Sequence, residues 1–407
     1  MPVYLNNLGI VCALGETKTG VLQHFLSGNQ DFMTTSERYG IETVVGEINS
    51  HLPDMNAFPS HQKTRNNQLA LLAFNQIAQT LESVSDTLKN TGKEHIRIAV
   101  VIGTSTSGIA SGEQSMECYL ATGRHDKNYH YAMQEMGAPA EFIAQLAEAN
   151  ASIYAISTAC TSSAKALISG QRLLTNGLAD IVIVGGVDSL CKMTINGFNS
   201  LESISSGHTK PFQQQRNGIN IGEGAALFVM SQVLGPVKLQ GYGESSDAHH
   251  ISAPHPQGNG AKQAMRAALK SANLQSADIN YINLHGTGTV QNDAMEATAV
   301  SEVFTAKTLC TPSKHLHGHC LGAAGAIEAG LCWLLLSDEN HDNIYPQIIL
   351  DGDVDPNIPL INLNVLLKDK TEENINKNNQ PLNYCMSNSY AFGGNNASLV
   401  LARTIGI

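Results

Sequence analysis

Apolar residues follow two patterns along the chain, which predict alternating strands and helices. Continuous β-branched runs at 96–102 (IRIAVVI) and 180–186 (DIVIVGG) are typical of strands buried on both faces. Apolar residues spaced three and four apart predict helices at 64–90, 261–272 and 293–303. Further strands are predicted at 3–14, 153–156, 224–231, 236–243, 281–284, 308–311, 360–365, 384–389 and 397–403. This alternation indicates an α/β protein.

The second half of the chain repeats the order of elements found in the first. In each half, a strand ends in a turn that leads into a helix of small residues. We therefore expect two related α/β halves, 1–240 and 241–407. Residues 108–150 show helical pieces without a strand, and residues 190–220 show no regular pattern. We interpret both segments as cap insertions in the first half.

The composition of the chain excludes some classes of function but says less about the fold. Of the 407 residues, 42% are apolar and 14% are charged, which is sufficient for a large buried core. The net charge of −11 argues against nucleic-acid binding, although a local basic patch could bind an acidic partner. Eight cysteines without a CxxC pair indicate a reducing compartment. No signal-peptide pattern and no run of about 18 apolar residues are found, so we expect a cytoplasmic protein without a membrane span.

The stretch 153–163 (IYAISTACTSS) places a cysteine between a strand and a helix. Unpaired N–H groups and the helix dipole at such a helix start favour a thiolate, so we expect a lowered pKa for Cys160. For an isolated cysteine, however, packing as a small buried hydrophobic residue is the more common role.

Three other turns lie at strand ends or helix starts. They carry His285, His319 and the run Phe392-Gly393-Gly394. Ligand sites in α/β sheets lie outside the carboxyl ends of strands, so these turns can form one site with Cys160. One cysteine and two histidines suit nucleophilic catalysis, but they are also preferred zinc ligands. No CxxC or HxxxH spacing supports zinc, and both interpretations remain open on the residues alone.

Four ordered motifs resemble those of the β-ketoacyl-[acyl carrier protein] synthases, the elongating condensing enzymes. They are TACTSS around Cys160, HGTGTVQND from His285, SKHLHGHCLGAAGA through His319, and NSYAFGGNN around Phe392. The resemblance covers nearly the whole chain. It implies a thiolase fold, a duplicated five-layered α-β-α-β-α arrangement. It also implies a homodimer, or a heterodimer with a related condensing-enzyme-like subunit.

The resemblance implies a two-stage reaction without a metal or other cofactor, with acyl groups delivered on the phosphopantetheine of an acyl carrier protein. Cys160 takes the acyl chain as a thioester. Malonyl-carrier protein then loses CO₂, and the carbanion attacks that thioester in a Claisen condensation. His285 and His319 are expected to donate hydrogen bonds from Nε2 during decarboxylation. The backbone N–H groups of Cys160 and Phe392 are expected to form the oxyanion hole, with Phe392, Gly393 and Gly394 acting as a gate.

Further roles follow from the same resemblance. Lys314 and Glu296 are expected to form a pair that supports the site, and Thr106 and Phe198 to border the acyl pocket. A small polar residue at Thr106 predicts a pocket open to long or unsaturated chains. The candidate surface for the acidic carrier protein consists of Lys63, Arg65, Arg124, Lys127, Lys210 and Lys262.

Alternative functions on the same fold differ at single positions. A degradative thiolase carries a second cysteine in the last turn, and the FGG turn here has none. A chain-length-factor-like partner subunit lacks the nucleophile, whereas this chain has Cys160. The sequence departs from the family at His317, where threonine is usual. The segment SLCKMTINGFNSLESIS suggests a polyene pathway of the aryl polyene type rather than housekeeping fatty acid synthesis.

Overall fold

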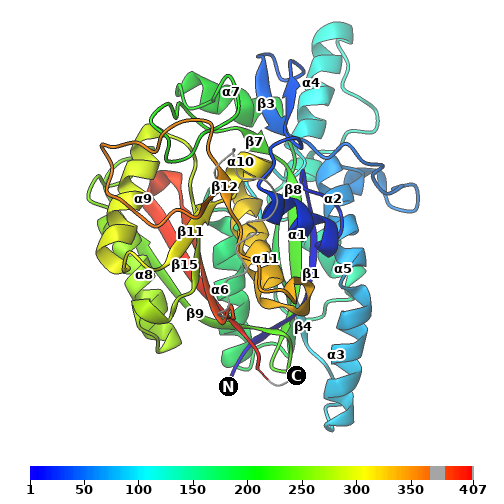
Figure 1. Ribbon diagram of the computed structural model, residues 1–407. Helices are drawn as coiled ribbons and strands as arrows, with labels where there is room; N and C mark the ends of the chain where they lie inside the picture. The colour runs from blue at the N-terminus through cyan, green and yellow to red at the C-terminus, as the bar shows by residue number, and fades with distance from the viewer. Residues whose placement is uncertain (367–380, 406–407) are drawn as a thin grey trace.

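Ten strands form one mixed sheet in the order β11-β10-β14-β15-β9-β1-β8-β6-β4-β5 (Figure 1). The computed structural model describes residues 1–366 and 381–405. The strands from the first part of the chain are β1 (Tyr4–Cys12), β4 (Ile98–Gly103), β5 (Ile153–Ile156), β6 (Ile181–Asp188) and β8 (Gly224–Ser231). Those from the second part are β9 (Val237–Ser246), β10 (Tyr281–Leu284), β11 (Leu309–Pro312), β14 (Tyr384–Tyr390) and β15 (Asn395–Arg403).

The two groups of five strands have the same topology. Numbered along the chain within each group, the strands follow the order 3-2-4-5-1 from the outer edge to the centre. In both groups the two innermost pairings are antiparallel and the two outermost are parallel. The first strand of each group, β1 and β9, meet at the centre as an antiparallel pair. The second repeat begins with β9, so a boundary at residue 240 falls inside this strand.

Six helices form the layers on either side of the two five-stranded groups. The helices α2 (Arg65–Asn75) and α5 (Ala138–Leu146) pack on the outer face of the first repeat, and α8 (Asn259–Ala272) and α9 (Val290–Val303) on that of the second. Between the repeats lie α6 (Ser162–Thr175) and α11 (Ala324–Leu336). Every residue of α11 is buried, as expected for a helix that is apolar on all sides. The predicted duplicated α-β-α-β-α arrangement is thus confirmed.

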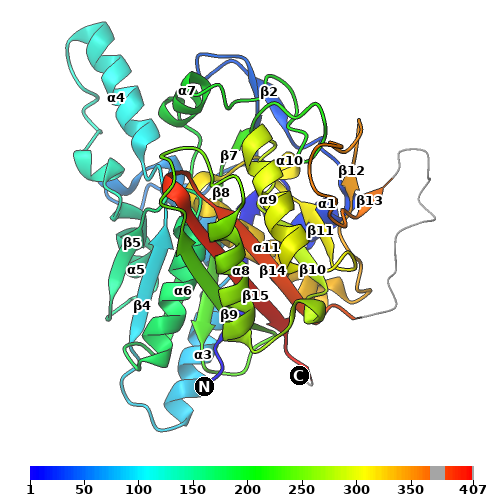
Figure 2. The same cartoon turned by 90° about the vertical axis from the view of Figure 1, so that its left-hand side faces the viewer.

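The cap segments contain more regular structure than the sequence predicts. Residues 190–220 include the helix α7 (Lys192–Ser200). Residues 108–150 include α4 (Ile109–Thr122), which projects from the body in Figures 1 and 2, but also α5. Phe142 and Ile143 of α5 are buried in the core of the first repeat, so this part is not an insertion.

Smaller differences concern element boundaries. The helix predicted at 64–90 is broken near Ile77 into α2 and α3 (Ala78–Asn90). The strand predicted at 360–365 is reduced to β13 (Val365–Leu366), which pairs with β12 (Ile348–Ile349). The remaining elements are α1 (Lys18–Ser27), α10 (Lys314–His317) and a small sheet of β2 (Thr34–Ser36), β3 (Thr43–Gly46) and β7 (Ile221–Gly222). Within the described ranges, no helix is long and apolar enough to cross a bilayer.

Candidate active site

Cys160 lies in the turn between β5 and α6. Ala159 before it has a φ of 51°, a left-handed conformation that is costly for a residue with a Cβ. The turn lies close to the neighbouring strand. A Cβ on Gly103, at the end of β4, would lie 2.3 Å from the backbone nitrogen of Ser163. This packing holds Cys160, which is 6% exposed, at the start of α6.

The predicted lowering of the Cys160 pKa is wrong. Burial raises the pKa of the thiol to about 11, because a thiolate there loses its hydration. The charge of Lys314 and the backbone N–H groups of Phe392 and Cys160 oppose this effect without outweighing it. The resting site therefore holds a protonated thiol. The same N–H groups point toward the sulfur, where an oxyanion would form next to it.

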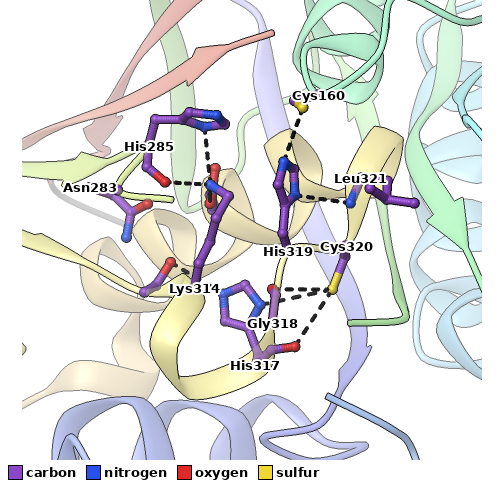
Figure 3. A network of polar contacts seen from close by, with 12 residues as sticks. Cys160, Asn283, His285, Lys314, His317, Gly318, His319, Cys320 and Leu321 are labelled. Atoms are coloured by element: carbon purple, nitrogen blue, oxygen red, sulfur yellow. Dashed lines mark hydrogen bonds and ion pairs between the residues drawn. The ribbon is translucent and has the colours of Figure 1, made fainter. Parts of the chain in front are cut away.

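His319 contacts the sulfur directly. Its Nε2 lies 3.0 Å from Cys160 Sγ, and the backbone N–H of Leu321 donates to its Nδ1 at 3.1 Å (Figure 3). Because Nδ1 accepts a hydrogen bond, the proton of the neutral ring is on Nε2. Burial, followed by the charge of Lys314, keeps the pKa of His319 well below its usual range. His319 is therefore a neutral donor toward the cavity and not a base for the thiol.

His285 is fixed in the same tautomer by a different group. The Lys314 ammonium lies 3.1 Å from its Nδ1 and 2.7 Å from its carbonyl oxygen (Figure 3). Burial and then Lys314 keep the pKa of His285 well below its usual range as well. The two imidazole rings are nearly perpendicular, with centroids 5.6 Å apart. Ligand atoms of Cys160, His285 and His319 all lie within 4.8 Å of one another.

The expected pair of Lys314 with Glu296 is not formed. Lys314 instead pairs with Glu328 of α11, and their side chains are 1% and 0% exposed. Glu296, on α9, accepts the backbone N–H groups of His285 and Gly286, each at 2.8 Å, and so holds the histidine turn. Burial raises the pKa of Glu328 to about 7 and that of Glu296 to about 8. Glu328 was missed, although it is the one charged residue in the apolar sequence of α11.

The turn at Phe392–Gly394 faces Cys160 from the second repeat. Gly393 and Gly394 have φ values of 81° and 76°, which glycine adopts without strain. The Phe392 ring lies 5.4 Å from the Phe198 ring of α7. The loop after β9 holds this turn through two backbone bonds. Gly393 N–H donates to Ile251 at 2.7 Å, and Gly394 accepts from the N–H of Asp247 at 2.8 Å.

These groups open into a cavity of about 440 Å³, a volume common for ligand sites. Phe198 and Phe392 line it, as do the polar residues Thr287 and Thr289. Thr106 is not part of this lining. Its side chain is fully buried and its hydroxyl donates to Asp188 Oδ1 at 2.7 Å. The structure therefore does not place Thr106 at an acyl pocket formed by this cavity.

Half of the six cations expected to bind a carrier protein are engaged within the fold. Arg65 binds the buried Glu223 at 2.5 Å, Lys210 binds Asp351 at 2.9 Å and Lys262 binds Glu302 at 2.8 Å. The other three are exposed and form no ion pair with any described residue: Lys63, Arg124 and Lys127.

A metal ion is the other use of the Cys160–His285–His319 cluster. Histidines that bind zinc usually donate their second ring N–H to a carboxylate or carbonyl. Here Nδ1 of each histidine accepts from an N–H donor instead, which puts the proton on the Nε2 that would bind the ion. The hydrogen bonds of both rings thus favour donation over metal binding.

The sequence of this chain is similar to those of known condensing enzymes. Family models described as the N-terminal and C-terminal domains of β-ketoacyl synthase match residues 8–233 and 237–348. The chain is 34% identical over 272 residues to a 3-oxoacyl-[acyl-carrier-protein] synthase 2 of Rhizobium meliloti (strain 1021), an alignment that covers 62% of this chain and 61% of that protein. Nodulation protein E of the same strain is 26% identical over 98% of both chains.

Solved structures extend the similarity along the whole chain. One describes a ketosynthase (ApeO) in complex with its chain length factor (ApeC) from Xenorhabdus doucetiae. It matches with a TM-score of 0.88 and 40% identity over 99% of this chain and 98% of that chain. A structure of the ishigamide ketosynthase/chain length factor has a TM-score of 0.84 at 24% identity, which supports the fold alone.

Proposed function

The chain belongs to the β-ketoacyl synthase family of acyl-transferring condensing enzymes, and we propose that it is an elongating 3-oxoacyl-[acyl carrier protein] synthase. The family and the acyltransferase class predicted from the four motifs are confirmed. One observation carries the specific proposal. Two neutral histidines present Nε2–H groups beside Cys160 Sγ, at a site that also holds two backbone donors.

In the first stage, Cys160 Sγ attacks the thioester of an acyl-carrier protein. A new C–S bond forms to Cys160, and the bond to the pantetheine sulfur breaks. The proton of the Cys160 thiol ends on the departing pantetheine, so that no net charge is left in the buried site. The N–H groups of Cys160 and Phe392 stabilise the tetrahedral oxyanion. Loss of one such donor typically costs about 2.7–4 kcal/mol.

In the second stage, malonyl-carrier protein binds with its thioester oxygen between His285 and His319. The C–C bond to the carboxylate breaks and CO₂ leaves, which puts negative charge on that oxygen. The two Nε2–H groups stabilise this charge without giving up a proton. The carbanion then attacks the Cys160 thioester, a C–C bond forms, and Cys160 leaves as a thiolate that takes a proton from water. The product is the 3-oxoacyl chain on the carrier protein.

We propose that a second, identical or related, subunit covers the β5 edge of the sheet. β5 is an edge strand, its outer side pairs with no strand in the described part of the chain, and Ile153 is 40% exposed. α4, which lies on the same side of the molecule as β5 in Figure 2, exposes three large apolar residues: Met116, Tyr119 and Leu120. The solved structure of a ketosynthase in complex with its chain length factor, at 40% identity, supports a related subunit as the partner. Lys63, Arg124 and Lys127 remain our candidates for binding the acidic carrier protein.

Two observations bear on the pathway in which the enzyme works. The chain shares 40% identity with a structure that contains a ketosynthase named ApeO, and its 189–205 segment (SLCKMTINGFNSLESIS) suggests an aryl polyene type of synthase. We therefore propose an unsaturated polyene chain as the substrate, with housekeeping fatty acid elongation as the alternative. Eight free cysteines support a reducing, cytoplasmic location. A chain-length-factor-like role is disfavoured because Cys160 and both histidines are in place.

Mass spectrometry of the protein after incubation with acyl-carrier proteins tests the proposal. Wild-type protein should gain the mass of the acyl group, and Cys160→Ala should not. Saturated and polyunsaturated chains offered in parallel would rank the substrates. If no chain gives an adduct on the wild type, the chain is not an acyl-transferring synthase.

A further inference from the structure

Lys165 lies near the N-terminus of α6, where the helix dipole disfavours a cation. It is the fourth residue of α6, in the first turn, where the positive end of the helix dipole repels a positive charge. Its side chain is only 18% exposed. A lysine here lowers helix stability and loses hydration, so its contacts have to account for its position.

The main contact of Lys165 is with the turn that carries Phe392. Lys165 Nζ donates to Asn395 Oδ1 at 2.8 Å. Asn395 closes that turn, because its carbonyl accepts the N–H of Ala391 at 2.8 Å. The one anion that pairs with Lys165 among the described residues is Glu244 of β9, at 3.9 Å.

The Phe392 turn needs such an anchor. It contains two glycines with positive φ, and two backbone bonds attach it to the loop after β9: Gly393 N–H donates to Ile251, whose side chain is 80% exposed, and Asp247 N–H donates to Gly394. β14 and β15 fix the two ends of this turn, whereas the backbone bonds of Gly393 and Gly394 run to that exposed loop. The bond from Lys165 instead ties it to α6, the helix that begins directly after Cys160.

We propose that Lys165 is a positioning residue for the oxyanion hole. Through Asn395 it fixes the Phe392 N–H relative to the Cys160 N–H, because both donors are then held by the same helix, α6. This inference rests on the proposed synthase function. It concerns the acyl-transfer stage, because the decarboxylation oxygen binds to His285 and His319 instead.

Arg172 offers a matched control on the same helix. It also pairs with Glu244, at 2.6 Å, but it is 51% exposed and no bond from it to the Phe392 turn is found among the described residues. Lys165→Met keeps the aliphatic stem and removes the ammonium. Arg172→Met removes a cation and an ion pair to the same glutamate without affecting the anchor.

The experiment compares two rates in the full-length protein. One is the single-turnover acylation of Cys160, followed by mass spectrometry, and the other is CO₂ release from malonyl-carrier protein. We expect Lys165→Met and Asn395→Ala each to slow acylation by about tenfold or more, because small misplacements in a reacting geometry cost up to about 10²-fold. CO₂ release should change less than about twofold, and Arg172→Met should leave both rates unchanged.

Two further variants separate positioning from folding. The double variant Lys165→Met/Asn395→Ala should be no slower than either single variant, because both remove one interaction. Asn395→Asp keeps an acceptor for Lys165 and should retain acylation, which also serves if Lys165→Met does not fold.

Three outcomes would overturn the inference while the wild type is acylated. They are acylation within about twofold of wild type in Asn395→Ala, equal losses in acylation and CO₂ release, and an equal loss in Arg172→Met. A wild type that is not acylated would instead refute the proposed function, and this inference with it.

Discussion

Replacing Lys314 with methionine should separate the stability of the site from its catalysis. Lys314 forms a buried ion pair with Glu328 and also donates to Nδ1 of His285. The variant leaves the Glu328 carboxyl in an apolar helix, where its Oε2 already has no partner among the described residues. Breaking a buried pair from one side typically costs about 3–5 kcal/mol. The double variant Lys314→Met/Glu328→Met leaves no unpaired buried charge, so it should recover most of the lost stability.

The stability loss should grow with pH. Glu328 has a pKa of about 7 in the folded protein, above the usual value of 4.5, so folding is favoured when it is protonated and stability falls as pH rises toward 7. Lys314 lowers that pKa, so the variant has a still higher one. Above pH 7 the wild type stops losing stability from this group while Lys314→Met continues, by up to about 1.4 kcal/mol per pH unit.

The same variants should affect catalysis differently from stability. Without Lys314, Nδ1 of His285 loses its donor, and the Nε2–H tautomer is no longer enforced. We expect CO₂ release from malonyl-carrier protein to fall by about 10²-fold, the lower limit for losing an oxyanion donor. The double variant should be equally slow despite its recovered stability.

Chemical denaturation at pH 6, 7 and 8 and CO₂ release measured on the three variants test this reasoning. Recovery of CO₂ release in the double variant would show that Lys314 acts through stability alone. A double variant as unstable as Lys314→Met would show that no stranded charge is involved.

Three other predictions follow from the electrostatics of the site. Protonation of His285 or His319 should not lower the CO₂-release rate as pH falls from 8 to about 6, because burial keeps the pKa of both well below 6.5; a loss of rate with a midpoint near pH 6.5 would contradict this. Iodoacetamide should alkylate Cys160 about tenfold faster per pH unit between pH 7 and 9, because its pKa is about 11 and the thiolate is the reactive form; a plateau below pH 8 would show a lower pKa. Elemental analysis should find well under one equivalent of zinc, and removal of trace metal by a chelator should leave acylation unchanged; stoichiometric zinc would favour the metal-binding alternative.

The sequence predicted those parts of the site that depend on local order. Cys160, His285 and His319 each lie at a strand end or helix start, where ligand sites of α/β proteins are found, so a shared site could be expected. Their contact itself depends on how the two repeats pack, because Cys160 follows β5 and His319 follows β11, which are opposite edge strands of the sheet. The repeat was predictable because the order of strands and helices is a property of the sequence.

Properties that depend on tertiary contacts were not predictable. The Cys160 pKa was misjudged because the helix start is visible in the sequence and the burial of the thiol is not. The partner of Lys314 was misassigned because Glu296 and Glu328 lie on different helices, and only packing decides which one reaches the ammonium. Thr106 was assigned to a pocket because the sequence does not show that the Asp188 carboxylate lies within reach of its hydroxyl.

The repeated sheet order has a consequence for the origin of the reacting pair. Cys160 and His319 occupy equivalent places, since each lies between the third strand of its repeat and the helix of the central layer. The equivalent strands β1 and β9 pair antiparallel, which implies an approximate two-fold axis between the repeats. That axis passes between α6 and α11, where Ala326 N–H donates to Ser163 Oγ at 2.8 Å. The nucleophile and the donor 3.0 Å from it thus lie in equivalent segments of the two repeats, which carry different side chains. The chemical asymmetry of the reaction resides in those side chains, on a backbone plan shared by both sides of the axis.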